Sequence, residues 1–169
     1  SFYVQPGSAI DEEAYKRGTS IYLVDRTIPM LPEQLSNLVC SLRPGEEKLC
    51  FAAIFELDDD AKVINESFEK TVINSNRRFS YDEAQKIIET GEGDLAEEIK
   101  VLWGLASKLK DARFKKGSIN FHTEEVKFIL DEKGKPTGVY IKEQKEANFL
   151  IEDFMLLANR RVAERIGRK

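Results

Sequence analysis

The sequence predicts an α+β fold in which mixed or antiparallel strand hairpins pack with several helices. Apolar residues alternate along residues 48–58 and return along 63–73, which is typical of a hairpin. Between residues 95 and 109, apolar residues recur at spacings of three and four, as on one face of a helix. A chain of 169 residues can bury a core within one domain, and no repeat or low-complexity linker divides it.

The first 45 residues are predicted to be mostly irregular. Acids at positions 11–13 favour the start of a short helix that ends at Gly18. Residues 21–24 favour a short strand, and the two prolines of residues 29–32 favour an extended loop. One or two helical turns are expected at residues 33–38.

The hairpin of residues 48–73 turns at Asp58-Asp59-Asp60-Ala61-Lys62. Three successive aspartates could suggest a divalent metal, but neighbouring side chains on a hairpin tip diverge and the EF-hand spacing is absent. We therefore predict a turn there. Five apolar side chains of the first strand are expected on one face: Leu49, Phe51, Ala53, Phe55 and Leu57.

The second half of the chain alternates between helices and a hairpin. Ser80 and Glu83 have the spacing of a capping box, which predicts a helix over residues 81–90. A longer helix is expected from residue 94 to 116, before Gly117. Residues 126–142 are predicted to form a second hairpin, and residues 145–166 a last helix.

The composition limits the classes of protein to consider. No apolar run approaches the roughly 20 residues of a membrane-spanning helix, and the N-terminus does not resemble a signal peptide. Cys40 and Cys50 lack the spacing of a metal site, so we expect both thiols to be reduced and buried. The expected compartment is the cytoplasm, and no membrane partner is expected.

The net charge of −4 argues weakly against nucleic acid, but two basic zones stand out at residues 100–117 and 158–169. Such zones are compatible both with an ordinary solvated surface and with local binding of a polyanion.

Motifs alone show no complete active site. The chain has one histidine, His122, and lacks nucleophile elbows and phosphate-binding glycine loops. The anomaly is Glu152, an acid on the largely apolar helical stretch 148–159. A buried carboxylate needs partners, so Glu152 either forms a structural salt bridge or lines a ligand cleft. Asp153 points about 100° away and is not expected to share its task.

Aromatic residues offer a second set of candidates. Residues 77–81 combine two arginines with Phe79 and Tyr81, and guanidinium groups with aromatic rings suit phosphates and bases. Phe121 follows a basic loop, and Tyr22 lies beside the proline-rich loop. Packing roles remain open for Phe79, Phe121 and Tyr22.

Several stretches, taken together, resemble the catalytic domain of ribonuclease R and ribonuclease II. They are Tyr3-Val4-Gln5-Pro6-Gly7-Ser8-Ala9-Ile10-Asp11, residues 17–23, Ile28-Pro29-Met30-Leu31-Pro32, residues 35–36, Cys40-Ser41-Leu42-Arg43-Pro44 and residues 150–159. In the last stretch the family usually has Glu-Glu where this chain has Glu152-Asp153. The resemblance covers the whole chain and is strongest to the ribonuclease R type.

The resemblance implies a processive 3′-to-5′ exoribonuclease that hydrolyses single-stranded RNA to nucleoside 5′-monophosphates with Mg²⁺. It matches Tyr22 and Phe121 to two aromatic residues that clamp terminal bases. It matches Tyr81 to a tyrosine near the scissile end and Glu152 to a glutamate that contacts the terminal ribose. RNA is thus the implied partner, and DNA is not expected.

The same resemblance implies that essential parts lie outside residues 1–169. In the family, the magnesium-binding aspartates precede the stretch equivalent to residues 1–4, and a phosphate-stabilising arginine follows the last residue. We therefore expect an incomplete catalytic-domain segment that holds no metal ligand set and is inactive alone. The alternative is a non-catalytic RNA- or protein-binding module on the same scaffold. The sequence leaves the oligomeric state undetermined.

Overall fold

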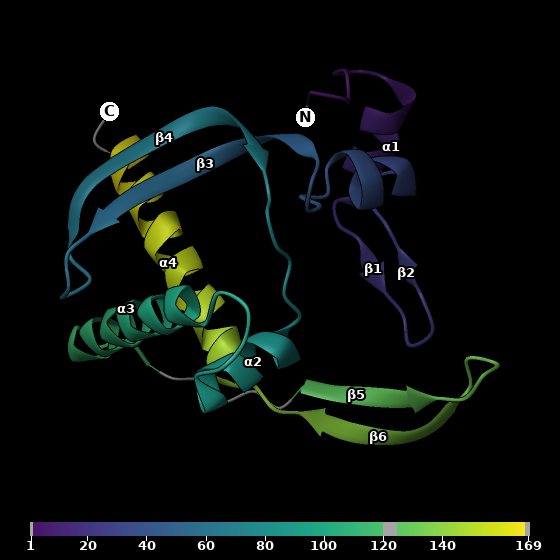
Figure 1. The fold of residues 1–169 in the computed structure, drawn as a ribbon. Helices are drawn as coiled ribbons and strands as arrows, with labels where there is room; N and C mark the ends of the chain where they lie inside the picture. Colours follow the sequence, from purple (N-terminus) through teal and green to yellow (C-terminus); the bar gives the residue numbers. More distant parts are fainter. Residues whose placement is uncertain (1, 120–124, 168–169) are drawn as a thin grey trace. The chain divides into compact units, whose positions relative to one another are not determined.

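The computed structural model describes residues 2–119 and 125–167 (Figure 1). Contacts group the chain into two compact units. The first comprises Ser1–Cys50, Val72–Asn76 and Glu124–Lys142, and the second Phe51–Thr71, Arg77–Thr123 and Glu143–Lys169. Two of the boundaries fall inside long strands, which explains why no change of composition marks them.

In the first unit, helix α1 (Ala9–Arg17) leads into a small hairpin. The Ser8 hydroxyl accepts a hydrogen bond from the Asp11 backbone N–H, and the helix ends at Gly18, whose φ of 68° is left-handed. Strands β1 (Ile21–Tyr22) and β2 (Thr27–Ile28) then pair antiparallel, with Tyr22 opposite Thr27. The predicted helix end at Gly18 is confirmed.

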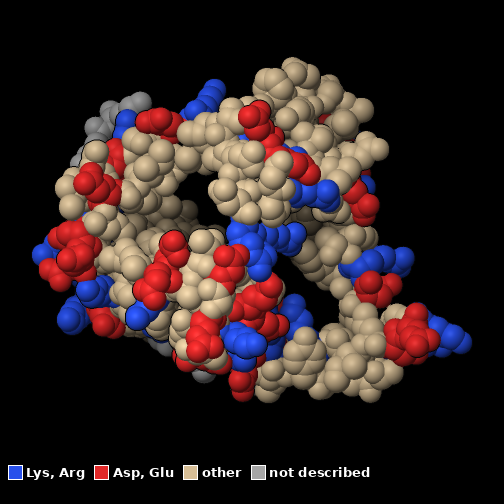
Figure 2. Space-filling model, viewed as in Figure 1, with Lys and Arg blue, Asp and Glu red and all other residues tan. Residues whose placement is uncertain are grey.

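A short helix and a longer hairpin also belong to the first unit. Residues Gln34–Val39 form η1, a π-helix, where we expected one or two turns. Strands β5 (Glu125–Leu130) and β6 (Pro136–Lys142) pair antiparallel with a register shift at Ile129/Leu130. Much of this hairpin is apolar and exposed. Figure 2 shows charged residues at its tip, and Glu125, Lys127 and Lys142 form ion pairs at the opposite end.

Strands β3 (Glu47–Leu57) and β4 (Val63–Asn74) form the predicted long hairpin. Its turn is held by Asp58, whose carboxylate accepts hydrogen bonds from the backbone N–H groups of Asp60 and Lys62. The turn is therefore confirmed.

The apolar face predicted for the first strand is only partly covered. Phe55 and Leu57 are half-buried, whereas Leu49 and Phe51 are exposed. Phe55 packs edge-to-face on Phe68, at 6.0 Å between ring centroids. The face is covered only near these rings, since a two-stranded sheet buries a side chain only where another element packs against it.

The second unit packs three helices, α2 (Tyr81–Thr90), α3 (Ala96–Lys115) and α4 (Glu146–Gly167), against one another. On the sheet side, Arg161 of α4 lies 2.5 Å from Glu66, and Arg165 lies over the Phe68 ring. The core is small. Its buried apolar residues are Ala61, Ile87, Ile99, Ala106, Ala147, Leu150 and Leu157.

A buried amide fixes α2 to the start of α4. The Gln85 carbonyl accepts from the backbone N–H of Ala147, and its amide donates to Glu146 and Glu89. The N–H groups of a helix's first turn have no partner within the helix, so Gln85 satisfies one of them from outside. This contact joins residues 62 positions apart.

The structure also bears on the expectations for membrane-spanning helices and for the two cysteines. Within the described residues, no helix is long and apolar enough to cross a membrane. Cys40 is exposed and Cys50 half-buried, so the expected burial of both thiols is wrong. Cys40 lies at the exposed end of η1, and Cys50 lies on a strand in a two-stranded sheet, where cover is incomplete.

Candidate functional site

Tyr22 lies on β1 with 79% of its surface exposed. A ring on a two-residue strand of a small hairpin has little around it to pack against among the described residues. An exposed aromatic face is available for stacking on a flat ligand such as a nucleic-acid base.

Tyr81 begins α2 and is half-exposed, at 51%. Its position is fixed by the capping box: the Ser80 hydroxyl accepts from the Glu83 backbone N–H, and the Glu83 carboxylate accepts from the Ser80 backbone N–H at 2.8 Å. That hydrogen bond, followed by those from the Ser80 side chain and Arg77, lowers the pKa of Glu83 from its usual value.

Next to Tyr81, Arg77 and Phe79 interact with each other. The Arg77 guanidinium lies 4.5 Å from the centre of the Phe79 ring. Arg77 also forms ion pairs with Asp94 at 3.1 Å and Glu83 at 3.3 Å. Arg77 therefore covers one face of Phe79 and joins the start of α2 to the segment before α3, which favours a structural role for both.

Tyr81 lines a hollow of about 430 Å³ formed by α2, α3 and α4. The rest of its wall is mostly apolar and includes Phe79, Leu102, Leu150 and Ile151. Ile151 directly precedes Glu152 on α4, but Glu152 does not line this hollow. The structure thus brings Tyr81 near the α4 segment that carries Glu152, without joining the two side chains.

Glu152 is exposed, with 45% of its side chain accessible, so its predicted burial on an apolar helix is wrong. The buried acid is its neighbour Asp153, whose side chain is only 3% accessible. On a helix that packs one face on α3, a shift of one residue moves a side chain from the open face to the covered one.

Both acids meet the same cation, although we expected them to act apart. Arg113 at the end of α3 donates to Asp153 at 2.9 Å and lies 3.7 Å from Glu152. A salt bridge, one of the two alternatives for Glu152, is therefore present, and it leaves the carboxylate open to solvent. From the sequence, Arg113 was only one member of a basic zone compatible with a solvated surface or with polyanion binding. Its contact with the acids could not be predicted, because only the packing of α3 on α4 brings it to them.

Not all of the sequence-based candidates lie in the part of the chain that the structure describes. Phe121 and the single histidine, His122, lie outside the described residues. Tyr22 belongs to the first compact unit, and Tyr81 and Glu152 to the second. Within residues 2–119 and 125–167, no three His, Cys, Asp or Glu side chains gather in an arrangement that could hold a metal ion.

The chain matches the RNB domain over residues 1–169. It belongs to the RNB domain family. Among similar curated proteins are DIS3-like exonuclease 2 of Schizosaccharomyces pombe, with 42% identity over 98% of this chain, and ribonuclease R 2 of Lactococcus lactis, with 40% identity over 96%. The RNB chain spans 20% and 26%, respectively, of the lengths of these relatives.

Solved structures agree with this membership. Mycoplasma genitalium RNase R in complex with ribose-methylated single-stranded RNA superposes with a TM-score of 0.91 at 30% identity. The match covers 99% of the RNB chain and 27% of that protein. Yeast Ssd1, a pseudonuclease, shares the fold alone, with a TM-score of 0.76 at 17% identity. The resemblance to ribonuclease R and the predicted α+β fold are confirmed.

Proposed function

We propose that the RNB chain is part of the catalytic domain of a 3′-to-5′ exoribonuclease that degrades single-stranded RNA processively to nucleoside 5′-monophosphates in the cytoplasm. The observation that carries this proposal is the family match over the whole chain, at about 40% identity to proteins named exonucleases and ribonucleases. Tyr22 and Tyr81, which the resemblance matches to RNA-contacting residues, are both exposed and so available to a ligand.

The aromatic residues would bind the bases of the RNA strand. Tyr22 presents an exposed ring, and stacking on a base contributes about 1–3 kcal/mol without regard to sequence. Phe121 is proposed as the second clamp residue on the resemblance alone. Tyr81, held at the start of α2 by its cap, would lie near the scissile end of the strand.

Glu152 would accept hydrogen bonds from hydroxyl groups of the terminal ribose. Its carboxylate is accessible, and Arg113 limits its movement from one side. A charged acceptor strengthens such hydrogen bonds relative to neutral ones. A ribose contact of this kind also distinguishes RNA from DNA when it involves the 2′-hydroxyl, consistent with the expected preference for RNA.

Magnesium is implied by the family, but the described residues do not fit it, because they contain no cluster of three carboxylate, thiol or imidazole groups. We assign no metal ligand and derive no catalytic step through the ion. In this proposal, the aspartate motif and the arginine motif belong to other segments of one catalytic domain, of which residues 1–169 are a part. The exposed apolar residues of β3–β4 and β5–β6 are faces that such segments would cover.

A non-catalytic RNA- or protein-binding module is the second candidate. It is favoured by the same lack of a metal-binding cluster in the described residues and by the yeast pseudonuclease, which shows that this fold occurs without nuclease activity. Sequencing the gene on both sides of this segment separates the two: an acid-rich motif directly before residue 1 supports the nuclease, and its absence supports the module.

Binding can be tested directly with a gel shift of short poly-adenosine RNA against the DNA strand of the same length. We expect RNA binding to be weak, because few cations contact the phosphates, and to weaken further as the salt concentration rises. We expect the DNA strand to bind more weakly than the RNA. Tight binding that salt does not change, or equal binding of DNA, would contradict the proposed role.

A further inference from the structure

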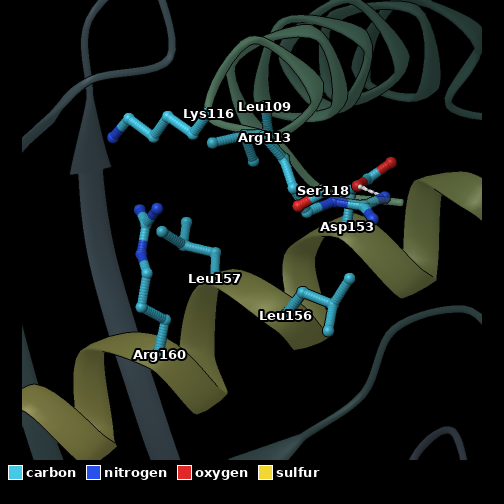
Figure 3. A pocket seen from close by; sticks show the side chains of 8 residues that line it. All are labelled: Leu109, Arg113, Lys116, Ser118, Asp153, Leu156, Leu157 and Arg160. Atoms are coloured by element: carbon cyan, nitrogen blue, oxygen red, sulfur yellow. Dashed lines mark hydrogen bonds and ion pairs between the residues drawn. The ribbon is translucent and has the colours of Figure 1, made fainter. Parts of the chain in front are cut away.

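A pocket of about 290 Å³ lies between the end of α3 and the middle of α4 in the second unit (Figure 3). Its polar lining carries three cations, Arg113, Lys116 and Arg160, against one acid, Asp153. This pocket is separate from the hollow lined by Tyr81, and Tyr22, Tyr81 and Glu152, the predicted site residues that the structure describes, do not line it.

The charges in the pocket are not balanced. Among the described residues of the lining, Asp153 is the one acid and is hydrogen-bonded to Arg113 at 2.9 Å, so Lys116 and Arg160 have no acid opposite them within the lining. Arg160 lies 4.0 Å from Glu164, and Glu164 is engaged more closely by Arg161 at 2.8 Å. In Figure 3, the ends of the Lys116 and Arg160 side chains extend to one side of the pocket, and the Arg113 guanidinium lies on the other side beside Asp153. A group bound by all three must therefore lie between these two sides.

A buried donor in the pocket wall lacks an acceptor. Among the described residues, the Nε of Arg113 is buried and has no hydrogen-bond partner. A buried polar group without a partner costs free energy, on the order of 1–3 kcal/mol, and often marks a ligand or ion absent from a structure. The group that would satisfy this donor must be an acceptor, and the neighbouring cations favour a negatively charged one.

The remaining lining restricts the kind of anion. Leu109, Leu156 and Leu157 form an apolar wall beside the cations, and Ser118 adds a hydroxyl. Guanidinium groups bind phosphate oxygens through paired N–H donors. An apolar wall suits the organic part of a phosphate ester, and the volume lies near the lower end of small-ligand pockets.

We propose that this pocket is a phosphate-binding site in which Arg113 Nε, Lys116 and Arg160 bind the phosphate of a nucleotide and the leucines contact its organic part. The phosphate can come from a free nucleoside monophosphate or from the backbone of an RNA strand. The site does not depend on the function proposed above, because it can be measured with inorganic phosphate alone.

The experiment is an NMR titration of the ¹⁵N-labelled chain at constant ionic strength, with inorganic phosphate as the first probe. We expect the Arg113 Nε–H signal to move as the donor gains an acceptor, together with amide signals around the pocket. The charge-removing variant Lys116→Gln/Arg160→Gln should bind phosphate about tenfold more weakly. Lys100→Gln, which removes a charge from the exposed side of α3, should bind as the wild type does.

Two further probes identify the source of the phosphate. Adenosine 5′-monophosphate offers a monoester, and an oligo-adenosine with hydroxyl ends offers only diesters. If only the monophosphate moves the Arg113 signal, the site takes a free nucleotide; if the oligonucleotide does so too, it takes the RNA backbone. The proposal is overturned if no probe moves that signal, or if the double variant binds as tightly as Lys100→Gln. If the chain binds phosphate but does not bind poly-adenosine, that result counts against the proposed function and not against this site.

Discussion

Arg113 and Asp153 lie 2.9 Å apart, 40 positions from each other in the sequence, and join the end of α3 to the middle of α4. Asp153 is nearly inaccessible, so this contact is a buried ion pair. Removing one member of such a pair strands a charge away from water. The same guanidinium reaches Glu152, which makes Arg113 the link between helix packing and the proposed ribose contact.

Replacing this cation should therefore destabilise the chain. We expect Arg113→Ala to lower the free energy of unfolding by about 3 kcal/mol, because it leaves the Asp153 carboxylate buried without its partner. Urea unfolding measures the change. Lys100→Ala on the exposed side of α3 is the matched control and should change stability by less than about 0.5 kcal/mol. Equal losses in the two variants would show that the pair is not a structural contact.

The Tyr22 ring should contribute directly to RNA affinity. Tyr22→Ala is expected to weaken binding of short poly-adenosine about tenfold, through the loss of one stacking contact. The control is Tyr15→Ala, which removes a ring from α1 that is 88% exposed. If both variants bind alike, the assignment of Tyr22 as a base clamp is wrong. Phe121→Ala tests the second clamp residue in the same gel shift.

The isolated chain should not degrade RNA. Phosphoryl transfer assisted by two metals needs carboxylates that hold the ions against the attacking and leaving oxygens, and no such cluster occurs among the described residues. We expect a labelled single-stranded RNA to keep its length on incubation with the chain and magnesium. Stepwise shortening from the 3′ end would show this expectation to be incorrect. An unrelated preparation of the same purity controls for contaminating nucleases.

The capping box of α2 should make stability depend on pH. The pKa of Glu83 is lowered, chiefly by the backbone N–H of Ser80, so its contribution is complete above its usual pKa and is lost as pH falls through the lowered value. We expect Glu83→Gln to be less stable than the wild type at neutral pH, with the difference shrinking on acidification. Unfolding curves across pH test this, with Glu97→Gln in the first turn of α3 as control.

The hydroxyl of the same cap offers a separate test. Ser80→Ala removes the acceptor for the Glu83 backbone N–H and should cost about 1 kcal/mol of stability. Because Tyr81 is positioned by this turn, we also expect the variant to weaken RNA binding. If Ser80→Ala is less stable but binds RNA as tightly as the wild type, the cap stabilises α2 without positioning Tyr81 for RNA.

The sequence by itself determined the local elements and the family. Gly18 marks the end of one helix, and the Ser80–Glu83 capping box marks the start of another. Left-handed glycine geometry and capping define such helix ends within a few residues, so both helices could be predicted from the sequence. The family resemblance rests on the order of short stretches in the sequence, and the match over residues 1–169 confirms it.

Tertiary structure decided which acid is buried and what balances it. The apolar pattern of α4 pointed to Glu152, but packing against α3 buries Asp153 and brings Arg113 to both acids. Helical periodicity identifies an apolar face without stating which part of it another helix covers. The pairing of residues 40 positions apart, and the basic pocket beside it, arise only when α3 and α4 pack together.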